Sequence, residues 1–194
     1  EVGVVSDLAY GALGYQGYEN PSFLSTPGAK DVGIEFYTFS KTFNMAGWRL
    51  AFAAGNGQMI EALNLIQDHL FVGIFPALQE AGIAALLNPN SEEAVAQLNA
   101  TYDSRRDAFV QAAAKIGWQA FPSRGSFYAW MPVPEGYTSE SFADLLLEKV
   151  HVAVAPGKGF GPAGDAYVRI GLLVEPERLV EAVNRIANLH LFNN

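Results

Sequence analysis

The chain contains no cysteine and comparatively little charge, since 16% of its 194 residues are Asp, Glu, Lys or Arg. Without cysteine, disulfide bonds and thiolate metal sites are excluded. Lysine and arginine number 12 against 20 acidic residues, so the formal net charge is −8. Nucleic-acid binding requires clustered basic side chains, and we therefore expect no nucleic-acid partner.

Long apolar segments are also lacking, although 50% of the residues are hydrophobic. No run approaches the length that spans a bilayer, and the acidic opening EVGVVSD does not resemble a signal peptide. We expect a soluble protein with no membrane partner. The chain opens without an initiator methionine, directly in the pattern of a buried parallel strand, and we expect it to be a fragment of a longer protein.

Hydrophobic patterning divides the chain into two parts. In the first part, runs rich in valine, isoleucine and aromatic residues predict strands, and apolar residues at helical spacing predict helices. The predicted strands are 1–7, 33–40 and 49–55, and the predicted helices are 57–70 and 76–87. Residues 11–33 are rich in Gly, Pro, Tyr and Ser, which predicts an irregular loop with one short helix.

A long helix is predicted at 91–116, with its cap at Ser91 and its end at Gly117. Beyond it the predicted elements become shorter. They are strands at 118–121, 126–131, 150–155 and 166–173, and helices at 139–150 and 175–191. We therefore predict an α/β protein with two domains, 1–90 and 118–194, joined by an interdomain helix at 91–117.

The segment FYTFSKTFNMAGWRLAFAAG, residues 36–55, places Lys41 between two apolar runs at the end of a predicted strand. Burying an ammonium group is costly, so most lysines in such places extend to solvent. The alternative is a lysine that forms an imine, which needs its amine held in place and partly deprotonated. Thr38 and Ser40 supply hydroxyl groups beside it, and Arg49 supplies a guanidinium whose geometry suits a phosphate.

A carboxylate and a phenol follow the first predicted strand. Asp7 ends that strand, and ligands of open α/β sheets bind at the carboxyl ends of strands. Taken alone, Asp7 could equally cap a helix or lie in a loop. Together with Tyr10 it suits a flat polar heterocycle, with the acid on a ring N–H and the phenol on a ring oxygen. Combined with Lys41 and Arg49, these groups predict a pyridoxal phosphate site.

These motifs closely resemble the class I and II (fold-type I) aminotransferases. SDLAY is followed by TFSKTFNMAGWR, and the match to SKTFNMAGWR is specific. Later in the chain, FPALQEAGIAAL, GSFYAWM and PGKGFGPAGDAYVRIGL resemble the C-terminal half of such enzymes, so the resemblance covers essentially the whole chain. It implies the C-terminal part of the large-domain sheet of the pyridoxal-phosphate transferase fold, which is mostly parallel, followed by the small α/β C-terminal domain.

The resemblance implies a role for each residue around the cofactor ring. Lys41 is implied to be the catalytic residue, which forms the imine with pyridoxal phosphate and then moves the proton. Asp7 is implied to pair with the pyridinium nitrogen, which keeps the ring an electron sink. Tyr10 is implied to bond the phenolic oxygen of the ring.

Further roles concern the phosphate and the substrate. The resemblance implies that Arg49 and Ser40 hold the phosphate, with Thr38 as a further candidate at a position where many relatives carry serine. Arg169, in YVRIGL, matches the arginine that clamps the substrate α-carboxylate. Without the family match, a structural salt bridge would be the preferred interpretation of Arg169.

The implied activity is amino-group transfer between an amino acid and a 2-oxo acid, in a cytoplasmic homodimer. The N-terminal half of such enzymes supplies further cofactor contacts, so we expect the chain alone to be inactive. Two alternatives stay open: a lyase or decarboxylase of the same fold and cofactor, and a non-catalytic regulatory module. Nothing in the sequence fixes the side chain of the substrate.

One motif points to a different chemistry. The stretch from Gly159 to Gly164 matches G-x-G-x-x-G, but Pro162 interrupts it and a predicted strand follows where a dinucleotide fingerprint needs a helix. We therefore expect a loop that positions the strand carrying Arg169. The sequence also predicts no metal site, because the histidines do not have metal-ligand spacing; they are His69, His151 and His190.

Overall fold

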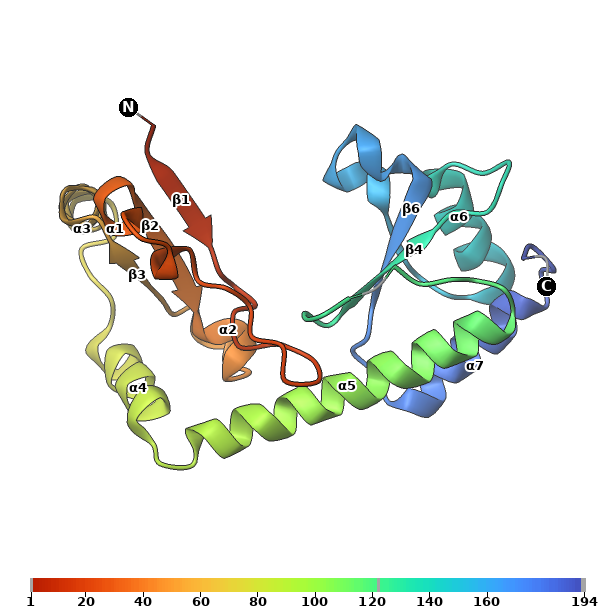
Figure 1. The fold of residues 1–194 in the computed structure, drawn as a ribbon, viewed down its shortest axis with the longest axis horizontal. Helices are drawn as coiled ribbons and strands as arrows, with labels where there is room; N and C mark the ends of the chain where they lie inside the picture. Colours follow the sequence, from red (N-terminus) through yellow and green to blue (C-terminus); the bar gives the residue numbers. More distant parts are fainter. Residues whose placement is uncertain (1, 122, 193–194) are drawn as a thin grey trace. The chain divides into compact units, whose positions relative to one another are not determined.

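The computed structural model describes residues 2–121 and 123–192. The chain forms two compact units, Glu1–Asn99 and Ala100–Asn194, and each contains a small sheet with its own helices (Figure 1). No helix among the described residues is both long enough and apolar enough to cross a membrane.

The first unit is built on a three-stranded mixed sheet in the order β1-β2-β3. The strands are β1 (Val4–Asp7), β2 (Gly33–Thr38) and β3 (Ala51–Gly55). β1 runs parallel to β2, whereas β3 is antiparallel to β2. The long loop between β1 and β2 contains the 3₁₀ turn η1 (Phe23–Ser25) and the one-turn helix α1 (Ala29–Val32), close to the irregular segment that the sequence predicts.

The prediction that the first strand is buried is wrong for this chain. β1 lies at one edge of the sheet, so only β2 flanks it, and the side chain of Val5 is 63% exposed. Valine-rich strands of this kind are typical of sheets covered on both faces. The described part of the chain supplies no such cover over β1.

The helices of the first unit begin and end close to the predicted positions. α3 (Gly57–Leu70) begins at Asn56, whose side chain accepts a hydrogen bond from Met59 N, and it packs against β2 and β3. α4 (Pro76–Leu87) begins with proline, which suits the first helical turn because its missing N–H has no partner there in any case. The one-turn helix α2 (Phe39–Thr42) directly follows β2.

A 25-residue helix, α5 (Ser91–Lys115), contains the boundary between the two units. Its C-terminal end closes with a hydrogen bond from Trp118 N to Ala113 O, and Gly117 adopts a φ of 82°. That conformation favours glycine, which explains why the helix ends where the sequence predicts. The domain assignment drawn from the sequence, with 91–117 as an interdomain helix, stays a prediction.

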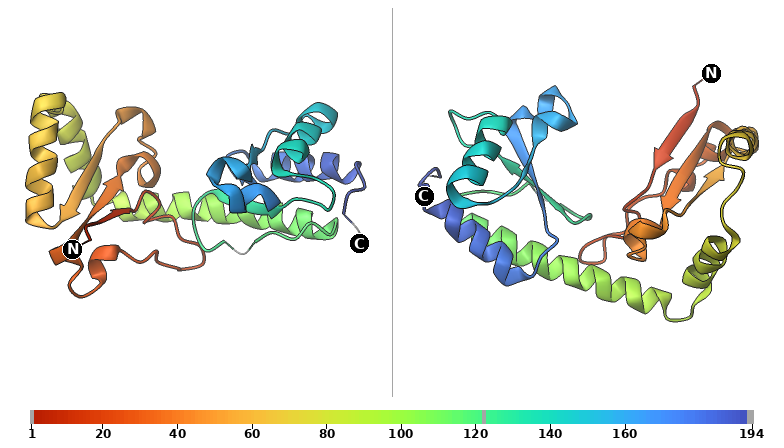
Figure 2. Two further views of the ribbon diagram at one scale, coloured as in Figure 1. Left: turned by 90° about the horizontal axis from the view of Figure 1, so that it is seen from above. Right: turned by 180° about the vertical axis from the view of Figure 1, so that it is seen from behind.

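The second unit contains an antiparallel sheet in the order β4-β6-β5. Its strands are β4 (Tyr128–Pro132), β5 (Ala155–Pro156) and β6 (Tyr167–Gly171). α6 (Ser139–Val150) contacts β6 and α7 (Pro176–Ala187), and α7 runs alongside the C-terminal part of α5 (Figure 2). The core between these elements includes the fully buried side chains Phe109, Trp118, Met131, Phe142, Leu146, Val168 and Val183.

Two predicted strands of the second unit are wrong. Residues 118–121 form no strand, and of the predicted strand 150–155 only Ala155 pairs with β6. Val150 is the last residue of α6, and His151 then adopts a left-handed conformation with a φ of 56°. Val152 N bonds back to Leu146 O, so the apolar run first completes the end of the helix. A helix end and a strand start have the same apolar composition, and periodicity over so few residues cannot separate them.

Candidate active site

Lys41 lies on α2, one turn beyond the end of β2, rather than on the strand itself. Thr38 is the last residue of β2 and caps this short helix, since its Oγ1 accepts a hydrogen bond of 3.1 Å from Ser40 N. The same hydroxyl donates to Ser40 Oγ at 2.9 Å. The cap turns the chain sharply at the carboxyl end of the strand and presents Lys41, which is half-buried, at that edge.

Asp7 and Tyr10 come to the same edge of the sheet. Asp7 ends β1 and is aligned with Phe36 of β2, and Leu8 N donates to Phe36 O at 2.9 Å. Parallel strands place their carboxyl ends together, so the chain leaving β1 passes close to the start of α2. Lys41 Nζ lies 6.0 Å from the centroid of the Tyr10 ring. The Asp7 side chain is exposed at this edge.

Arg49 returns to this edge through the turn between α2 and β3. Thr38 pairs with Ala51, and Phe39 N donates to Leu50 O at 3.1 Å, so the two ends of the turn are held together. Arg49 adopts a left-handed φ of 53° directly after the 3₁₀ turn η2 (Ala46–Trp48). Left-handed backbone is uncommon outside glycine and often marks functional positions.

The guanidinium of Arg49 is exposed and donates a hydrogen bond of 3.1 Å to Ala46 O. A guanidinium has five N–H groups, so this contact leaves several donors for an anion. In the hydroxyl pair, by contrast, the oxygen of Thr38 is already used as a cap, and Ser40 Oγ accepts the Thr38 hydrogen. The geometry therefore favours Arg49 and the Ser40 hydroxyl, more than Thr38, as anion-binding groups.

Aromatic packing fixes the turn that carries Lys41. The Phe39 ring is buried and packs against Phe43 and Phe52, with centroids 5.6 Å and 6.0 Å away. Tyr37 stacks on Phe52 at 5.3 Å, and its hydroxyl group forms a 2.6 Å hydrogen bond with Thr42 Oγ1. The lysine is thus carried on a turn whose neighbouring residues are held by rings and by a partly buried hydrogen bond.

Glu35 is a buried acid on β2, aligned with Ser6 of β1, and it is not among the residues predicted from the sequence. Its side chain accepts three hydrogen bonds, from Ser6 Oγ at 3.0 Å, Ser22 Oγ at 2.6 Å and Phe23 N at 2.7 Å. It thereby fastens β1 and the start of η1 to β2. The available signal was an acid inside the apolar run GIEFYT, because a carboxylate in a buried strand requires partners.

Arg169 belongs to the second unit, in the middle of β6, the central strand of its sheet. Its Cζ atom lies 4.1 Å from the centroid of the Tyr128 ring and 4.1 Å from that of Phe160. Within residues 2–121 and 123–192, no ion pair joins its guanidinium to a carboxylate. The structural salt bridge considered from the sequence is therefore not what holds this arginine there.

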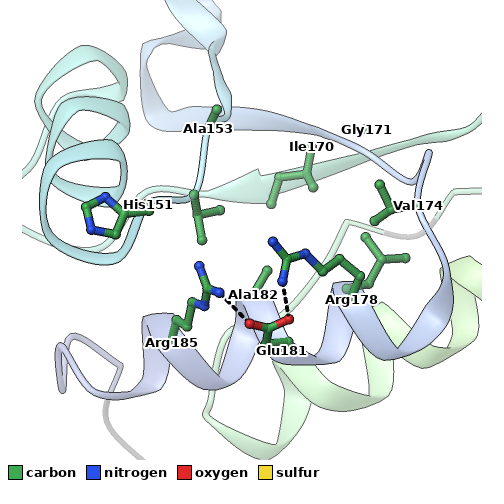
Figure 3. A pocket seen from close by; sticks show the side chains of 11 residues that line it. His151, Ala153, Ile170, Gly171, Val174, Arg178, Glu181, Ala182 and Arg185 are labelled. Carbon is green, nitrogen blue, oxygen red and sulfur yellow. Dashed lines mark hydrogen bonds and ion pairs between the residues drawn. The ribbon is translucent and has the colours of Figure 1, made fainter.

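A separate cavity of about 210 Å³ in the second unit lies over α7, beside the end of α6 and β6 (Figure 3). Glu181 lies between Arg178 and Arg185 on one face of α7 and accepts hydrogen bonds from both. The bonds from Arg178 and then Arg185 lower the pKa of the Glu181 carboxyl below its usual value. None of the predicted site residues lines this cavity.

Comparison with known proteins gives the family. The family model of class I and II aminotransferases matches residues 1–186. The chain belongs to this family. The α/β fold predicted from the sequence is also confirmed: a solved structure of BacF from Bacillus subtilis without ligand has a TM-score of 0.92 and 44% identity, over 99% of this chain and 49% of that one. An aminotransferase from Staphylococcus aureus has a TM-score of 0.92 and 41% identity, over 98% and 50%.

Among curated family members, this chain is similar to an L-glutamine–4-(methylsulfanyl)-2-oxobutanoate aminotransferase of Bacillus subtilis (strain 168). The identity is 59% over 97% of this chain and 47% of that protein. An LL-diaminopimelate aminotransferase of Moorella thermoacetica is 47% identical, over 94% of this chain and 46% of its own length. The chain thus spans about half the length of the aminotransferases that it matches.

Proposed function

We propose that the intact protein is a pyridoxal-phosphate-dependent aminotransferase, which transfers an amino group between an amino acid and a 2-oxo acid. The observation that carries the proposal is the arrangement in the first unit, where Lys41, Asp7, Tyr10 and Arg49 come to one edge of one sheet. The chemistry of these four groups suits this cofactor. The amine suits its carbonyl, the carboxylate its ring nitrogen, the phenol its ring oxygen and the guanidinium its phosphate. The aminotransferase names of the relatives support transfer rather than lyase chemistry.

Each residue then has a defined task. Bound pyridoxal phosphate would supply the electron sink for the reaction. Lys41 Nζ would hold the cofactor covalently and move the α-proton of the substrate. The Asp7 carboxylate would hold a proton on the ring nitrogen, and Tyr10 would donate its hydroxyl hydrogen to the ring oxygen. These tasks require a carboxylate and an amine at the same edge of the sheet, and the exposed Asp7 and half-buried Lys41 there support the proposal.

The remaining groups bind and orient. Arg49 and the Ser40 hydroxyl would hold the phosphate, and Thr38 would support them by capping the turn. Arg169 would bind the α-carboxylate of the substrate through two parallel N–H···O bonds, which is the geometry that a guanidinium favours. The absence of a competing ion pair at Arg169 within the described part of the chain supports that role.

The names of the relatives suggest the first substrates to test. The Bacillus subtilis relative is named for L-glutamine and 4-(methylsulfanyl)-2-oxobutanoate, and we propose this pair ahead of LL-diaminopimelate because its identity is higher. We also propose that residues 1–90 form the C-terminal part of the cofactor-binding large domain, that 118–194 form the small domain and that 91–117 form the interdomain helix. A cytoplasmic homodimer is part of the same proposal, supported by the family resemblance.

The role of Lys41 is tested with the full-length protein. Lys41→Ala should abolish the visible absorption band of lysine-bound pyridoxal phosphate and stop amino transfer from L-glutamine. Lys30→Ala is the matched control, because Lys30 is exposed on α1 and lies outside the proposed site. Borohydride reduction followed by peptide mass mapping should place the cofactor on Lys41. A band that persists in Lys41→Ala would show that another residue holds the cofactor.

A further inference from the structure

The glycine-rich loop before β6 is folded tightly on itself. It consists of two 3₁₀ turns, η3 (Gly157–Phe160) and η4 (Pro162–Ala166), which pack directly against each other. A Cβ atom on Gly157 would lie 2.2 Å from Gly164 O, and one on Gly164 would lie 2.1 Å from Gly157 O. Only a pair of glycines permits this approach, so a side chain at either position would force the two turns apart.

This loop carries Phe160, whose side chain is 53% exposed and therefore gains little from burial. Its ring nevertheless has a defined place. Its centroid lies 4.1 Å from Arg169 Cζ, and the ring meets Trp130 edge-on at 5.9 Å. Trp130 in turn stacks on Tyr167 at 5.4 Å. Phe160 is thus supported from behind and faces the arginine.

Tyr128 holds the same guanidinium from β4. It lies two residues before Trp130, which pairs directly with Arg169, so Tyr128 is a diagonal neighbour on the same face of the sheet. Its ring centroid is also 4.1 Å from Arg169 Cζ. Two rings at this distance from one planar cation hold its orientation without neutralising its charge, which a carboxylate partner would do.

We propose that Phe160 and Tyr128 form an aromatic clamp that orients the guanidinium of Arg169 for in-plane, two-bond pairing with a carboxylate. Cζ lies over the face of each ring, and a planar group packed on rings in this way uses its N–H edge to bind a carboxylate bidentately. Phe160 is then a positioning residue for the substrate carboxylate. This inference rests on the substrate-binding role proposed above for Arg169.

The test is Phe160→Leu in the full-length holoenzyme, which removes the ring but keeps an apolar side chain. We expect the KM for L-glutamine to rise about five- to tenfold, as loss of one partly exposed cation–π contact implies, while kcat stays within about twofold. Phe121→Leu is the matched control, since Phe121 is 60% exposed and its ring meets Tyr167 but not Arg169. It should leave both constants unchanged.

Two further measurements separate positioning from general packing. The reaction of 4-aminobutanamide, which is L-glutamine without its α-carboxylate, should not differ between Phe160→Leu and the unaltered enzyme. In an Arg169→Lys background, Phe160→Leu should no longer raise the KM for L-glutamine, because the guanidinium that it orients is gone. An equal loss with 4-aminobutanamide, or an undiminished effect in the Arg169→Lys background, would show that Phe160 only packs the loop.

Failure of this inference is distinguishable from failure of the proposed function. Binding of 4-(methylsulfanyl)-2-oxobutanoate, followed through the Arg169 Nε–H resonance, does not require turnover. If the unaltered protein binds this acid at Arg169 and Phe160→Leu weakens that binding, the clamp stands even where amino transfer is not observed. If amino transfer proceeds and Phe160→Leu changes neither the KM nor this binding, the clamp is wrong and the function stands.

Discussion

At the scale of single residues, hydrogen-bond partners separate side chains that the sequence presents as equivalent. Thr38 and Ser40 are both hydroxyl residues beside Lys41, and both are candidates for a phosphate. In the structure, Thr38 Oγ1 accepts the hydrogen bond that caps α2 and donates its hydrogen to Ser40 Oγ. The Ser40 hydroxyl can therefore still donate its own hydrogen to another acceptor. The difference arises because Thr38 ends the strand and so occupies the capping position.

Glu35 carries a prediction at this scale. Glu35→Gln should lower the free energy of unfolding by about 1–3 kcal/mol, since hydrogen bonds to a charged carboxylate are replaced by weaker ones to a neutral amide, and the NH₂ group meets the Ser22 hydroxyl where Oε1 accepted from it. The amide oxygen takes the place of Oε2, which accepts from Ser6 Oγ and Phe23 N, because the backbone N–H cannot turn away. Urea denaturation measures the change, with Glu61→Gln on the exposed face of α3 as the control. Equal effects of the two substitutions would show that the three hydrogen bonds to Glu35 contribute nothing.

At the scale of elements, the sequence predicts those that begin or end at a chemical signal. Asn56 caps α3, Pro76 opens α4 and Gly117 follows α5, and these boundaries agree with the structure to within about two residues. The strand predicted at 150–155 does not form before Ala155, because His151 adopts a left-handed conformation at the end of α6. Histidine gives no sequence signal for this conformation, as a glycine would. Lys41 and Arg49 stay predicted site residues, which a motif indicates, whereas Glu35 was missed because its partners come from distant parts of the chain.

The ion cluster on α7 carries a pH prediction. Hydrogen bonds from Arg178 and Arg185 lower the folded-state pKa of the Glu181 carboxyl, so its contribution to stability is present above the unfolded value and is lost as the pH falls through the folded value. The difference in unfolding free energy between the unaltered protein and Glu181→Gln should therefore be constant near neutral pH and shrink in acid, below about pH 4.5. Chemical denaturation over this range measures it. A difference that grows in acid would contradict the assignment.

At the scale of the whole molecule, one short motif predicted the family because SKTFNMAGWR is specific, whereas no motif pointed to a surface where another polypeptide packs. The segment between α3 and α4 shows this most clearly. Phe71 and Phe75 are exposed there, and Val72 is 89% exposed. Contiguous apolar surface of this kind usually marks a place where another polypeptide packs.

The 194-residue chain on its own should therefore self-associate. We expect its weight-average mass in sedimentation equilibrium to rise with concentration. The exposed apolar segment between α3 and α4 can pack against a second chain, and the edge of β1 opposite β2 can pair with another strand. Replacing Phe71 and Phe75 together by serine should reduce this association. The same pair of substitutions at Tyr18 and Trp48, which are 37% and 46% exposed and lie outside this segment, is the control. A chain that stays monomeric up to about 100 µM would show that these surfaces do not associate.

The glycines before β6 are not equivalent, and the difference bears on how such loops are recognised. Gly157 and Gly164 are fixed by mutual contact and Gly161 by a φ of 125°, whereas a side chain at Gly159 would meet nothing within 4 Å. The dinucleotide-like pattern starts at Gly159, the least constrained of the four, and leaves out Gly157. An alanine at position 159 would remove the match to the dinucleotide pattern but would leave the loop unchanged. A pattern search would therefore depend on the one glycine that the structure of this loop does not require.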